Sequence, residues 1–302
     1  MSTRAIPEEL RKFEIPGRVA VAEGNGGLAK ISVSSGQAAA EIYLQGAHVT
    51  GFRKRGEAPL LFVSAESHFA PGQPIRGGVP ICLPWFGPRT GEPAHGFVRL
   101  LSWELAETSV ACNGAVTIRL QLPQNSVKPE WSALRAEFVV TIADTLTMEL
   151  LATNQSTGKI PAVENCLHTY FYVGDIAQVS IAGLQAAPFD DFATGAGGAR
   201  KWEDDLVLRL TQETNRVYPD ATGAVEIRDE ELKRTIHVEK FNSRSTVVWN
   251  PWTTQKLPDD FDPAEHKHMV CVESGNVKQN SFPLAPGETS TLRVKLSTTP
   301  LQ

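Results

Sequence analysis

The chain has 302 residues, of which 41% are hydrophobic and 21% are charged, so it can bury a large core and is not a disordered chain. It carries 29 Lys and Arg residues against 34 Asp and Glu residues, a formal net charge of -5. That balance excludes the strongly basic surface on which nucleic-acid binding depends, although two or three local arginines would still suffice to hold a small anion.

The first 18 residues lack the apolar run of a secretory signal. No later stretch approaches the ~18 consecutive apolar residues that indicate a membrane-spanning helix. The four cysteines, at positions 82, 112, 166 and 271, are too widely spaced for a zinc ribbon or a redox pair. We therefore expect a cytoplasmic protein with buried, reduced thiols and no membrane or nucleic-acid partner. The sequence shows no marked apolar stripe, which favours a monomer.

Helical pattern is scarce, and two short segments carry it, residues 7–13 and 263–268. Each is long enough for a turn or two of helix. The chain also contains 24 glycines and 20 prolines, which suit many turns better than many helices.

Strand-like segments instead follow one another along most of the chain. They cover residues 30–35, 39–52, 115–122, 137–144, 146–154, 178–184, 224–229, 234–240, 245–250, 268–274 and 290–296. Within 146–154, Leu146, Met148 and Leu150 fall on one face and Thr147 and Glu149 on the other, which is the period of two typical of a strand. These patterns predict a single all-β domain, residues 1–302, built from packed antiparallel sheets.

Residues 74–103, PIRGGVPICLPWFGPRTGEPAHGFVRLLSW, interrupt this pattern with five prolines and five glycines. Such a backbone is costly to place in a sheet, so we expect an ordered loop across the end of a sheet, where functional groups are common. The loop holds four side chains that are cationic or can become so: Arg76, Arg89, His95 and Arg99. Each of them is also compatible with a plain surface position.

Arg76 is followed by two glycines, which would let backbone amides approach an anion. Arg99 lies four residues beyond His95 and could converge with Arg76 on one phosphate, a group that planar guanidinium binds well. This loop is therefore a candidate anion site.

The octapeptide ENCLHTYF, residues 164–171, places His168 in the middle of a strand-like segment. His168 is either a packed core imidazole or a proton donor directed into a pocket. The segment alone does not decide between the two.

Two further segments depart from ordinary strand pattern. In VWNPW, residues 248–252, Trp249 and Trp252 flank a turn and form either a plug over the core or an aromatic wall for a sugar ring. In HMVCVESGN, residues 268–276, Glu273 follows a buried run at the expected end of a strand. A partly desolvated carboxylate there would be a useful base, whereas at the rim of the sheet it would be solvated.

Taken in order, RGGVPICLPWFGPR, PAHGFVR, LHTYF, VVWNP, CVE and LAPGE resemble the hexose-6-phosphate mutarotases, also called glucose-6-phosphate 1-epimerases, of the galactose-mutarotase-like superfamily. The resemblance spans about residues 30–295. It implies a β-supersandwich fold and an enzyme that interconverts the α and β anomers of hexose 6-phosphates, above all glucose 6-phosphate, without a metal or other cofactor.

The same resemblance implies roles for individual residues. His168 matches the general acid and Glu273 the general base of the family. Arg76 and Arg99 match the arginines that hold phosphate and sugar, and His95 matches a second pocket histidine that helps polarise the ring oxygen. Two positions depart from many members: Ala94 stands where some have glutamine, and Asn215 of TNRVY stands where many have an aspartate that contacts the sugar. The expected substrate-binding residues are therefore Arg76, His95, Arg99, Asn215 and Trp249.

Anomer exchange requires an acid at the ring oxygen and a base at the anomeric hydroxyl, and one imidazole and one carboxylate on opposite sides of the C1–O5 bond supply both. In this interpretation His168 starts protonated and Glu273 starts ionised.

Three other functions stay open from the sequence. A noncatalytic sugar-phosphate-binding or regulatory protein would use the same aromatic and basic residues. A metal enzyme would use the H-x-H pair His266 and His268, supplemented by His95, His168 and Glu273. A glycosidase or lyase would need a second carboxylate, for which the candidates are Glu164, Asp190 and Asp191.

Overall fold

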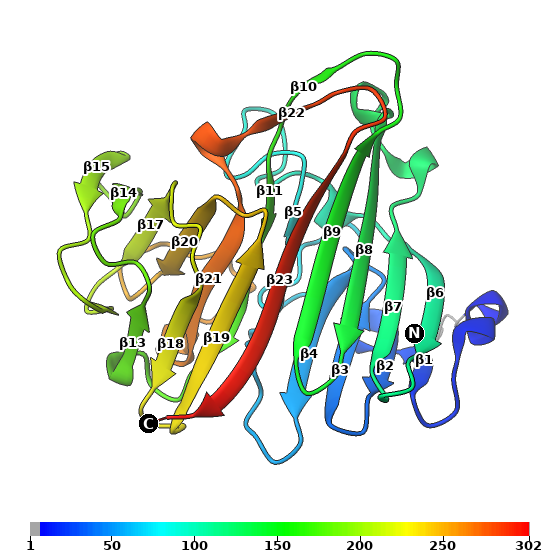
Figure 1. The fold of residues 1–302 in the computed structure, drawn as a ribbon, viewed down its shortest axis with the longest axis horizontal. Coiled ribbons are helices and arrows are strands. Elements are labelled where there is room, and N and C mark those ends of the chain that lie inside the picture. The colour runs from blue at the N-terminus through cyan, green and yellow to red at the C-terminus, as the bar shows by residue number, and fades with distance from the viewer. Residues whose placement is uncertain (1–6, 302) are drawn as a thin grey trace.

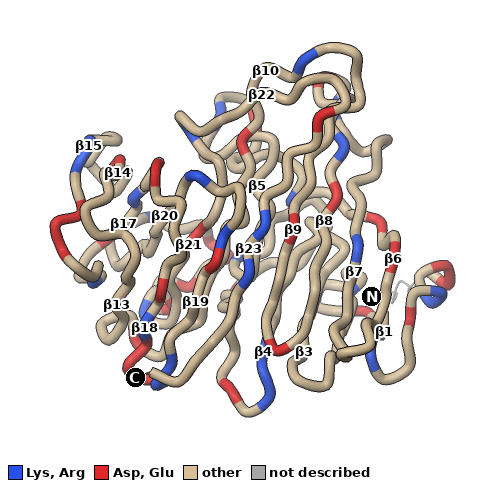
Figure 2. Tube along the Cα trace, in the orientation of Figure 1, with Lys and Arg blue, Asp and Glu red and all other residues tan. Residues whose placement is uncertain are grey.

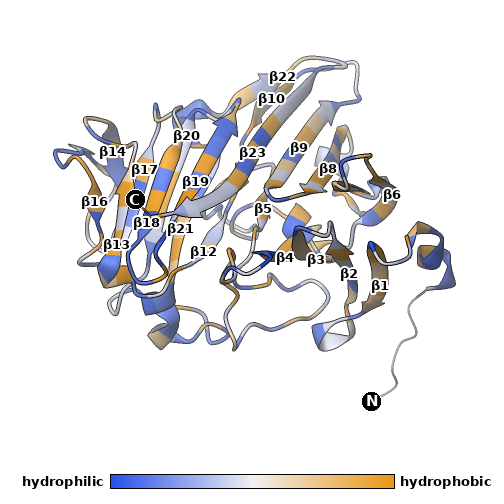
Figure 3. Ribbon diagram, turned by 60° about the horizontal axis from the view of Figure 1, so that its bottom comes forward, coloured by the Kyte–Doolittle hydropathy of each residue, from blue (hydrophilic) through white to orange (hydrophobic). Residues whose placement is uncertain are grey.

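The computed structural model describes residues 7–301 and is built almost entirely from antiparallel strands. Its largest sheet runs across the front of the molecule, and the other sheets lie behind it as a second layer (Figures 1 and 3). The apolar core lies between the layers. The predicted all-β supersandwich is therefore confirmed.

The front layer is a nine-stranded sheet whose strands pair antiparallel throughout. Its order is β16 (Leu208–Arg209), β13 (Val179–Ala182), β18 (Val225–Asp229), β19 (Arg234–Phe241), β23 (Thr289–Pro300), β9 (Leu146–Asn154), β8 (Leu134–Ile142), β7 (Val116–Gln121) and β6 (Glu104–Val110).

The second layer contains an eight-stranded sheet and a four-stranded sheet. The eight-stranded sheet has the order β15 (Ala199–Trp202), β14 (Pro188–Asp191), β17 (Thr214–Tyr218), β20 (Ser245–Asn250), β21 (Met269–Asn276), β11 (Asn165–Leu167) and β5 (Ile81–Cys82), with β12 (Tyr170–Tyr172) also paired to β21. The four-stranded sheet has the order β1 (Val19–Glu23), β2 (Ala29–Ser34), β3 (Ala38–Tyr43) and β4 (His48–Lys54).

A two-stranded ribbon and short 3₁₀ helices complete the fold. The ribbon pairs β10 (Ile160–Val163) with β22 (Phe282–Leu284). The helices are η1 (Glu8–Phe13), η2 (Asn25–Gly27), η3 (Val98–Leu100), η4 (Gln124–Ser126), η5 (Pro129–Trp131), η6 (Ile176–Gln178), η7 (Pro263–His268) and η8 (Lys278–Asn280). Both segments that the sequence marked as helical turns are confirmed, as η1 and η7.

The long strands of the nine-stranded sheet are buried on one face only. Burial alternates residue by residue along β8 and β9, and the bands of hydropathy along β9 and β23 show the same alternation (Figure 3). Leu146, Met148 and Leu150 are fully buried, as their spacing predicts. The sheet therefore packs its apolar face on the core and leaves its other face to solvent.

Strand β21 differs, because all eight of its residues are buried. One face, with Val270 and Val272, packs into the main core, whereas the other holds Cys271 and Glu273. The strand also runs on to Asn276, so the prediction that it ends near Glu273 is wrong. Gly275 makes this possible, because a side chain there would clash with the Asn165 carbonyl of the neighbouring strand.

The segment 74–103 is mostly loop, as expected, with a two-residue edge strand, β5, and the helix η3. Of the two glycines after Arg76, Gly78 does not serve the predicted purpose, since its amide donates to the Phe62 carbonyl at 2.6 Å. Both have positive φ and lie where a Cβ atom would strike the backbone of Phe62 or Val49. These glycines therefore let the loop lie close to the sheet, and this placement fixes the position of the preceding residue, Arg76.

Three of the four free cysteines are buried, but Cys112 is exposed in the turn between β6 and β7, so the prediction of four buried thiols is wrong for that residue.

Acidic and basic residues are interspersed along the trace (Figure 2). Within residues 7–301 no helix is long and apolar enough to cross a membrane. Of the first 18 residues, in which the sequence predicts no secretory signal, residues 1–6 lie outside the part of the chain that the structure describes. The single-domain boundary of 1–302 stays a prediction.

Candidate active site

A cavity of about 490 Å³ opens over the face of the eight-stranded sheet that carries Glu273. Loop 74–103 and residues 255–261 close it on the other side. All seven residues expected at the site line this one cavity: Arg76, His95, Arg99, His168, Asn215, Trp249 and Glu273. The sheet supplies the last four and the loop the first three.

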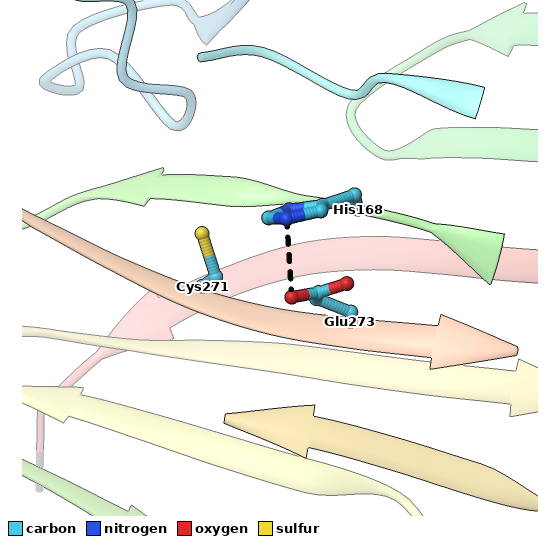
Figure 4. A group of neighbouring side chains, drawn as sticks. All are labelled: His168, Cys271 and Glu273. Atoms are coloured by element: carbon cyan, nitrogen blue, oxygen red, sulfur yellow. Dashed lines mark ion pairs between the residues drawn. The ribbon is translucent and has the colours of Figure 1, made fainter. Parts of the chain in front are cut away.

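His168 and Glu273 meet because of strand register. Leu167 pairs with Ser274 on one side of an interruption in the ladder, and Tyr170 pairs with Cys271 on the other. The register is the same on both sides, so His168 lies directly opposite Glu273. Their side chains leave the same face of the sheet, and His168 Nε2 lies 3.3 Å from Glu273 Oε1 (Figure 4). The two groups are therefore neighbours, which differs from the expected placement on opposite sides of a bound sugar.

The imidazole of His168 is only 7% exposed and is held mainly by stacking. It lies parallel to the Tyr170 ring, with centroids 4.7 Å apart, and Nδ1 has no hydrogen-bond partner among the described residues. Burial, followed by the nearby His95 and Arg99, lowers the pKa of His168 well below its ordinary value. These surroundings therefore favour a neutral imidazole over the predicted imidazolium.

Glu273 is 1% exposed, and burial raises the pKa of its carboxyl well above the ordinary value. Two groups oppose that effect: the Cys166 thiol, which donates to Oε2 at 3.7 Å, and the charge of Arg99. Since His168 is shifted down and Glu273 up, the pair holds one proton over a wide pH range. A pair with a single proton offers one acid and one base at the same time.

His95 is the second imidazole in the cavity, with its ring centroid 5.4 Å from that of His168. It has a positive φ of 64°, and its backbone amide is anchored on the Gly87 carbonyl. Burial, then Arg99, lowers its pKa to about 3, so the ring is neutral. The Gly87 amide donates to Nδ1 at 3.4 Å, which leaves the proton on Nε2. His95 is therefore a hydrogen-bond donor.

Arg76 and Arg99 are held in different ways. The Nε of Arg76 donates to both Asp260 oxygens, at 2.9 and 3.1 Å, which leaves its two terminal nitrogens without a partner in the described chain. Arg99 donates to the Ala94 carbonyl at 2.8 Å, while its buried Nε has no partner among residues 7–301. Each guanidinium therefore keeps donors available for a ligand.

Cations exceed carboxylates in this cavity. Lys256 and Lys278 also line it, and neither they nor Arg99 form an ion pair within the described residues. Glu273 is the one carboxylate among the described residues of the lining. The cavity is therefore suited to an anionic ligand.

Trp249 forms part of the wall, edge-on to the rings of His168 and Tyr170, and its indole nitrogen donates to Gln255 at 2.8 Å. Trp252, the other tryptophan of VWNPW, packs against the core instead. Trp249 thus fits the interpretation as a wall of the sugar site, and Trp252 fits the interpretation as a plug over the core. Asn215 of β17 pairs with Trp249 of β20, and its side-chain amide nitrogen lies 3.4 Å from the Phe192 carbonyl oxygen.

Sequence reasoning missed several groups at the site. Tyr170 follows His168 by two residues and so shares its face of the sheet, a signal that was present in LHTYF. Cys166 precedes His168 by the same spacing. Asp260, Lys256 and Lys278 lie in or beside loops, and no local pattern distinguishes them from surface residues.

The residues specific to two alternative functions lie outside this cavity. His266 and His268 are directed at the backbone carbonyls of Pro263 and Gly174. The carboxylates considered as partners for Glu273 are engaged in other contacts: Glu164 with the amides of Phe86 and Lys278, Asp190 with Arg200, and Asp191 with Lys201. Neither the proposed H-x-H metal site nor a paired-carboxylate site is formed by these residues.

A β-supersandwich with an imidazole and a carboxylate side by side on one sheet face, in a cavity rich in cations, defines a galactose-mutarotase-like protein. The family model described as aldose 1-epimerase matches residues 29–297. The chain belongs to the aldose 1-epimerase family.

Individual relatives agree with this family. A protein named "Putative glucose-6-phosphate 1-epimerase" from Cenchrus ciliaris is 33% identical over 86% of this chain and 82% of its own length. One of the same name from Escherichia coli is 36% identical over 81% of this chain and 82% of its own. A crystal structure of a "putative mutarotase" from Salmonella typhimurium superposes with a TM-score of 0.85 at 28% identity, covering 95% of both chains.

Proposed function

We propose that this protein interconverts the α and β anomers of hexose 6-phosphates, with glucose 6-phosphate as the preferred substrate. The observation that carries the proposal is the 3.3 Å contact between His168 Nε2 and Glu273 Oε1 in a cavity that also holds Arg99, Lys256 and Lys278, which form no ion pair within residues 7–301. The family and the names of its relatives support the same reaction.

The adjacency of the two groups suits the chemistry. The anomeric oxygen O1 and the ring oxygen O5 are bonded to the same carbon, so a base at one and an acid at the other must also be close together. His168 protonates O5 while Glu273 takes the proton of the O1 hydroxyl, and the C1–O5 bond breaks. The C1–C2 bond then rotates, and closure returns both protons. Each group contributes about 10²–10⁴ to the rate.

Burial prepares the pair for the open-chain stage. After ring opening, His168 is neutral and Glu273 is protonated, which is the distribution that their pKa shifts favour. The cyclic sugar requires the opposite distribution. A bound phosphate dianion beside Arg99 offsets one of the causes that lower the pKa of His168, after burial and His95, and so shifts the pair toward the imidazolium form.

The surplus of cations supports a phosphorylated substrate over a free sugar. Arg76 and Arg99 present several N–H donors, a geometry that matches phosphate oxygens. His95 donates from Nε2 to the ring oxygen, and the indole ring of Trp249 packs against the sugar. Asn215 brings no charge where many relatives carry aspartate, so we propose that it binds a sugar hydroxyl as a neutral partner.

The deciding experiment measures anomer exchange of glucose, galactose and mannose 6-phosphates and of free glucose by exchange NMR. We expect the wild-type protein to accelerate exchange for the phosphosugars, glucose 6-phosphate fastest. His168→Ala should exchange the anomers at the spontaneous rate and still bind the sugar phosphate in calorimetry. If the wild-type protein binds sugar phosphate without accelerating exchange, the noncatalytic alternative holds and the enzymatic proposal fails.

The remaining expectations, a single domain acting as a cytoplasmic monomer without nucleic-acid partners, stay predictions. Sedimentation analysis would test the oligomeric state directly.

A further inference from the structure

The proposed reaction does not use Cys271, although its thiol lies beside the reacting pair. Cys271 precedes Glu273 by two residues on β21, so both side chains leave the same face of the sheet. It is fully buried and forms no hydrogen bond among the described residues. Figure 4 shows its sulfur directed toward the level of the His168 ring, next to the His168–Glu273 contact.

The three side chains form a compact set of potential metal ligands. One nitrogen of His168, the sulfur of Cys271 and one oxygen of Glu273 all lie within 4.8 Å of one another. Three atoms at such separations can all be placed within about 2.8 Å of a common point. Zinc binds imidazole nitrogen and carboxylate oxygen at about 2.0–2.2 Å and thiolate sulfur at about 2.3 Å. Shifts of less than about 1 Å would therefore complete three of the four ligands of a zinc ion.

A second observation concerns the availability of the imidazole. His168 is held by stacking on Tyr170, and its Nδ1 has no hydrogen-bond partner among residues 7–301. The ring can therefore adjust without breaking a hydrogen bond. His168 and Glu273 also line the cavity, which gives an ion from solvent a path to them.

The surroundings distinguish a reversible site from a resident one. Histidines that hold a resident zinc almost always donate their second nitrogen to a carboxylate or carbonyl, and His168 has no such partner in the described chain. Arg76 and Arg99 also line the cavity, and their charge weakens the binding of any divalent cation. A metal would therefore bind here as an exchangeable inhibitor.

We propose that His168, Cys271 and Glu273 form an inhibitory site for thiophilic divalent cations such as Zn²⁺. Binding releases the thiol proton and the proton shared by the acid–base pair to solvent, and the cation takes their place. With both reacting groups ligated, neither can transfer a proton. The inhibitory effect rests on the proposed function, whereas the binding site itself does not.

The test uses Zn²⁺ and Co²⁺ with the intact, metal-free protein. Saturating Zn²⁺ should lower kcat for anomer exchange about 100-fold, and EDTA should restore it. Mg²⁺, which prefers oxygen ligands, should have no effect. Co²⁺ should give a thiolate charge-transfer band in the near ultraviolet, which reports ligation by sulfur without any activity.

Cys271→Ser should bind Co²⁺ without the thiolate band and should keep most of its activity in Zn²⁺. The exposed Cys112 provides the matched control, since Cys112→Ser should behave as the wild type in both assays. Absence of the thiolate band in the wild-type protein, or a band that survives in Cys271→Ser, would overturn the proposal. Lack of anomer exchange by the metal-free wild type would defeat the proposed function instead and would leave the spectroscopic result to decide the metal site.

Discussion

Strands β9 and β21 are both long central strands, yet β9 is buried on one face and β21 on both. On β9, leucine and methionine face the core and glutamate faces solvent. On β21, valines face the core, whereas on the other face Glu273 lines the cavity and Cys271 packs beside it in a small apolar cluster. A buried carboxylate on a strand without a solvent face has no structural reason to be there. The comparison shows that the face of β21 turned away from the main core is the face that carries the active site.

The largest effect should come from Glu273→Gln, compared with Glu149→Gln on β9. The amide keeps the shape of the side chain but cannot accept the anomeric proton, so kcat for anomer exchange should fall about 10³-fold. Glu149→Gln lies on the solvent face and should change kcat less than about twofold. Exchange NMR measures both, and equal losses would remove the distinction between the two strands.

Leu150→Ala tests the other side of the comparison. Leu150 is fully buried in the core of the nine-stranded sheet, so its truncation leaves a cavity and should lower the free energy of unfolding by about 2–5 kcal/mol. Because no residue of β9 lines the active-site cavity, kcat at 25 °C should stay unchanged. Urea denaturation gives the stability. A proportional loss of activity in the folded variant would argue that the two faces are coupled.

Lys240 of β19 is a buried cation outside the active-site cavity, and its ammonium group donates to the Ala221 carbonyl and to Thr246. Burial lowers its pKa from 10.5 to about 7. The folded state therefore disfavours the charged form, and stability is lost as pH falls from about 10.5 to about 7. Between pH 9 and pH 7 this loss amounts to about 2 kcal/mol.

The matched variant is Lys240→Met, which removes the titrating group. Its free energy of unfolding should lack this loss between pH 9 and pH 7, while its kcat should equal that of the wild type. Identical pH dependence in the two proteins, measured by urea denaturation at each pH, would rule out a lowered pKa of Lys240 in the folded state.

Arg76→Ala should have the smallest effect of the four. It removes one of several phosphate donors, so KM for glucose 6-phosphate should rise roughly tenfold, with little change in KM for free glucose. Arg89→Ala is the control, because Arg89 lies in the same loop but stacks on Trp85 outside the active-site cavity. Equal changes in both KM values would show that Arg76 does not bind phosphate.

The sequence predicted the parts of the fold that local pattern determines. Leu146, Met148 and Leu150 alternate with polar residues, and the period alone assigns their strand and their buried face. The two residues of β5 and the four residues of β14 carry too little pattern to be recognised as strands. The sequence predicts a strand end near Glu273, at SGN, whereas Gly275 lets β21 continue against β11.

The site was predictable as a set of residues but not as a geometry. Motifs identified His168 and Glu273, yet strand pairing between distant segments is not a local property, so their direct contact could not be foreseen. Asp260 orients Arg76 from a loop far along the chain, which no spacing rule reveals. The neutral state of His168 likewise follows from burial, which becomes known only with the tertiary structure.

The continuous register that sets His168 opposite Glu273 fixes their separation through the pairing of β11 and β12 with β21 on either side of the histidine. Insertions and deletions in the surrounding loops can therefore reshape what the cavity admits without disturbing the distance over which protons move. A shift of β11 and β12 by a single residue along β21 would instead turn the imidazole into the apolar interior. Changes in the loops can therefore alter the choice of substrate while the reaction centre keeps its geometry.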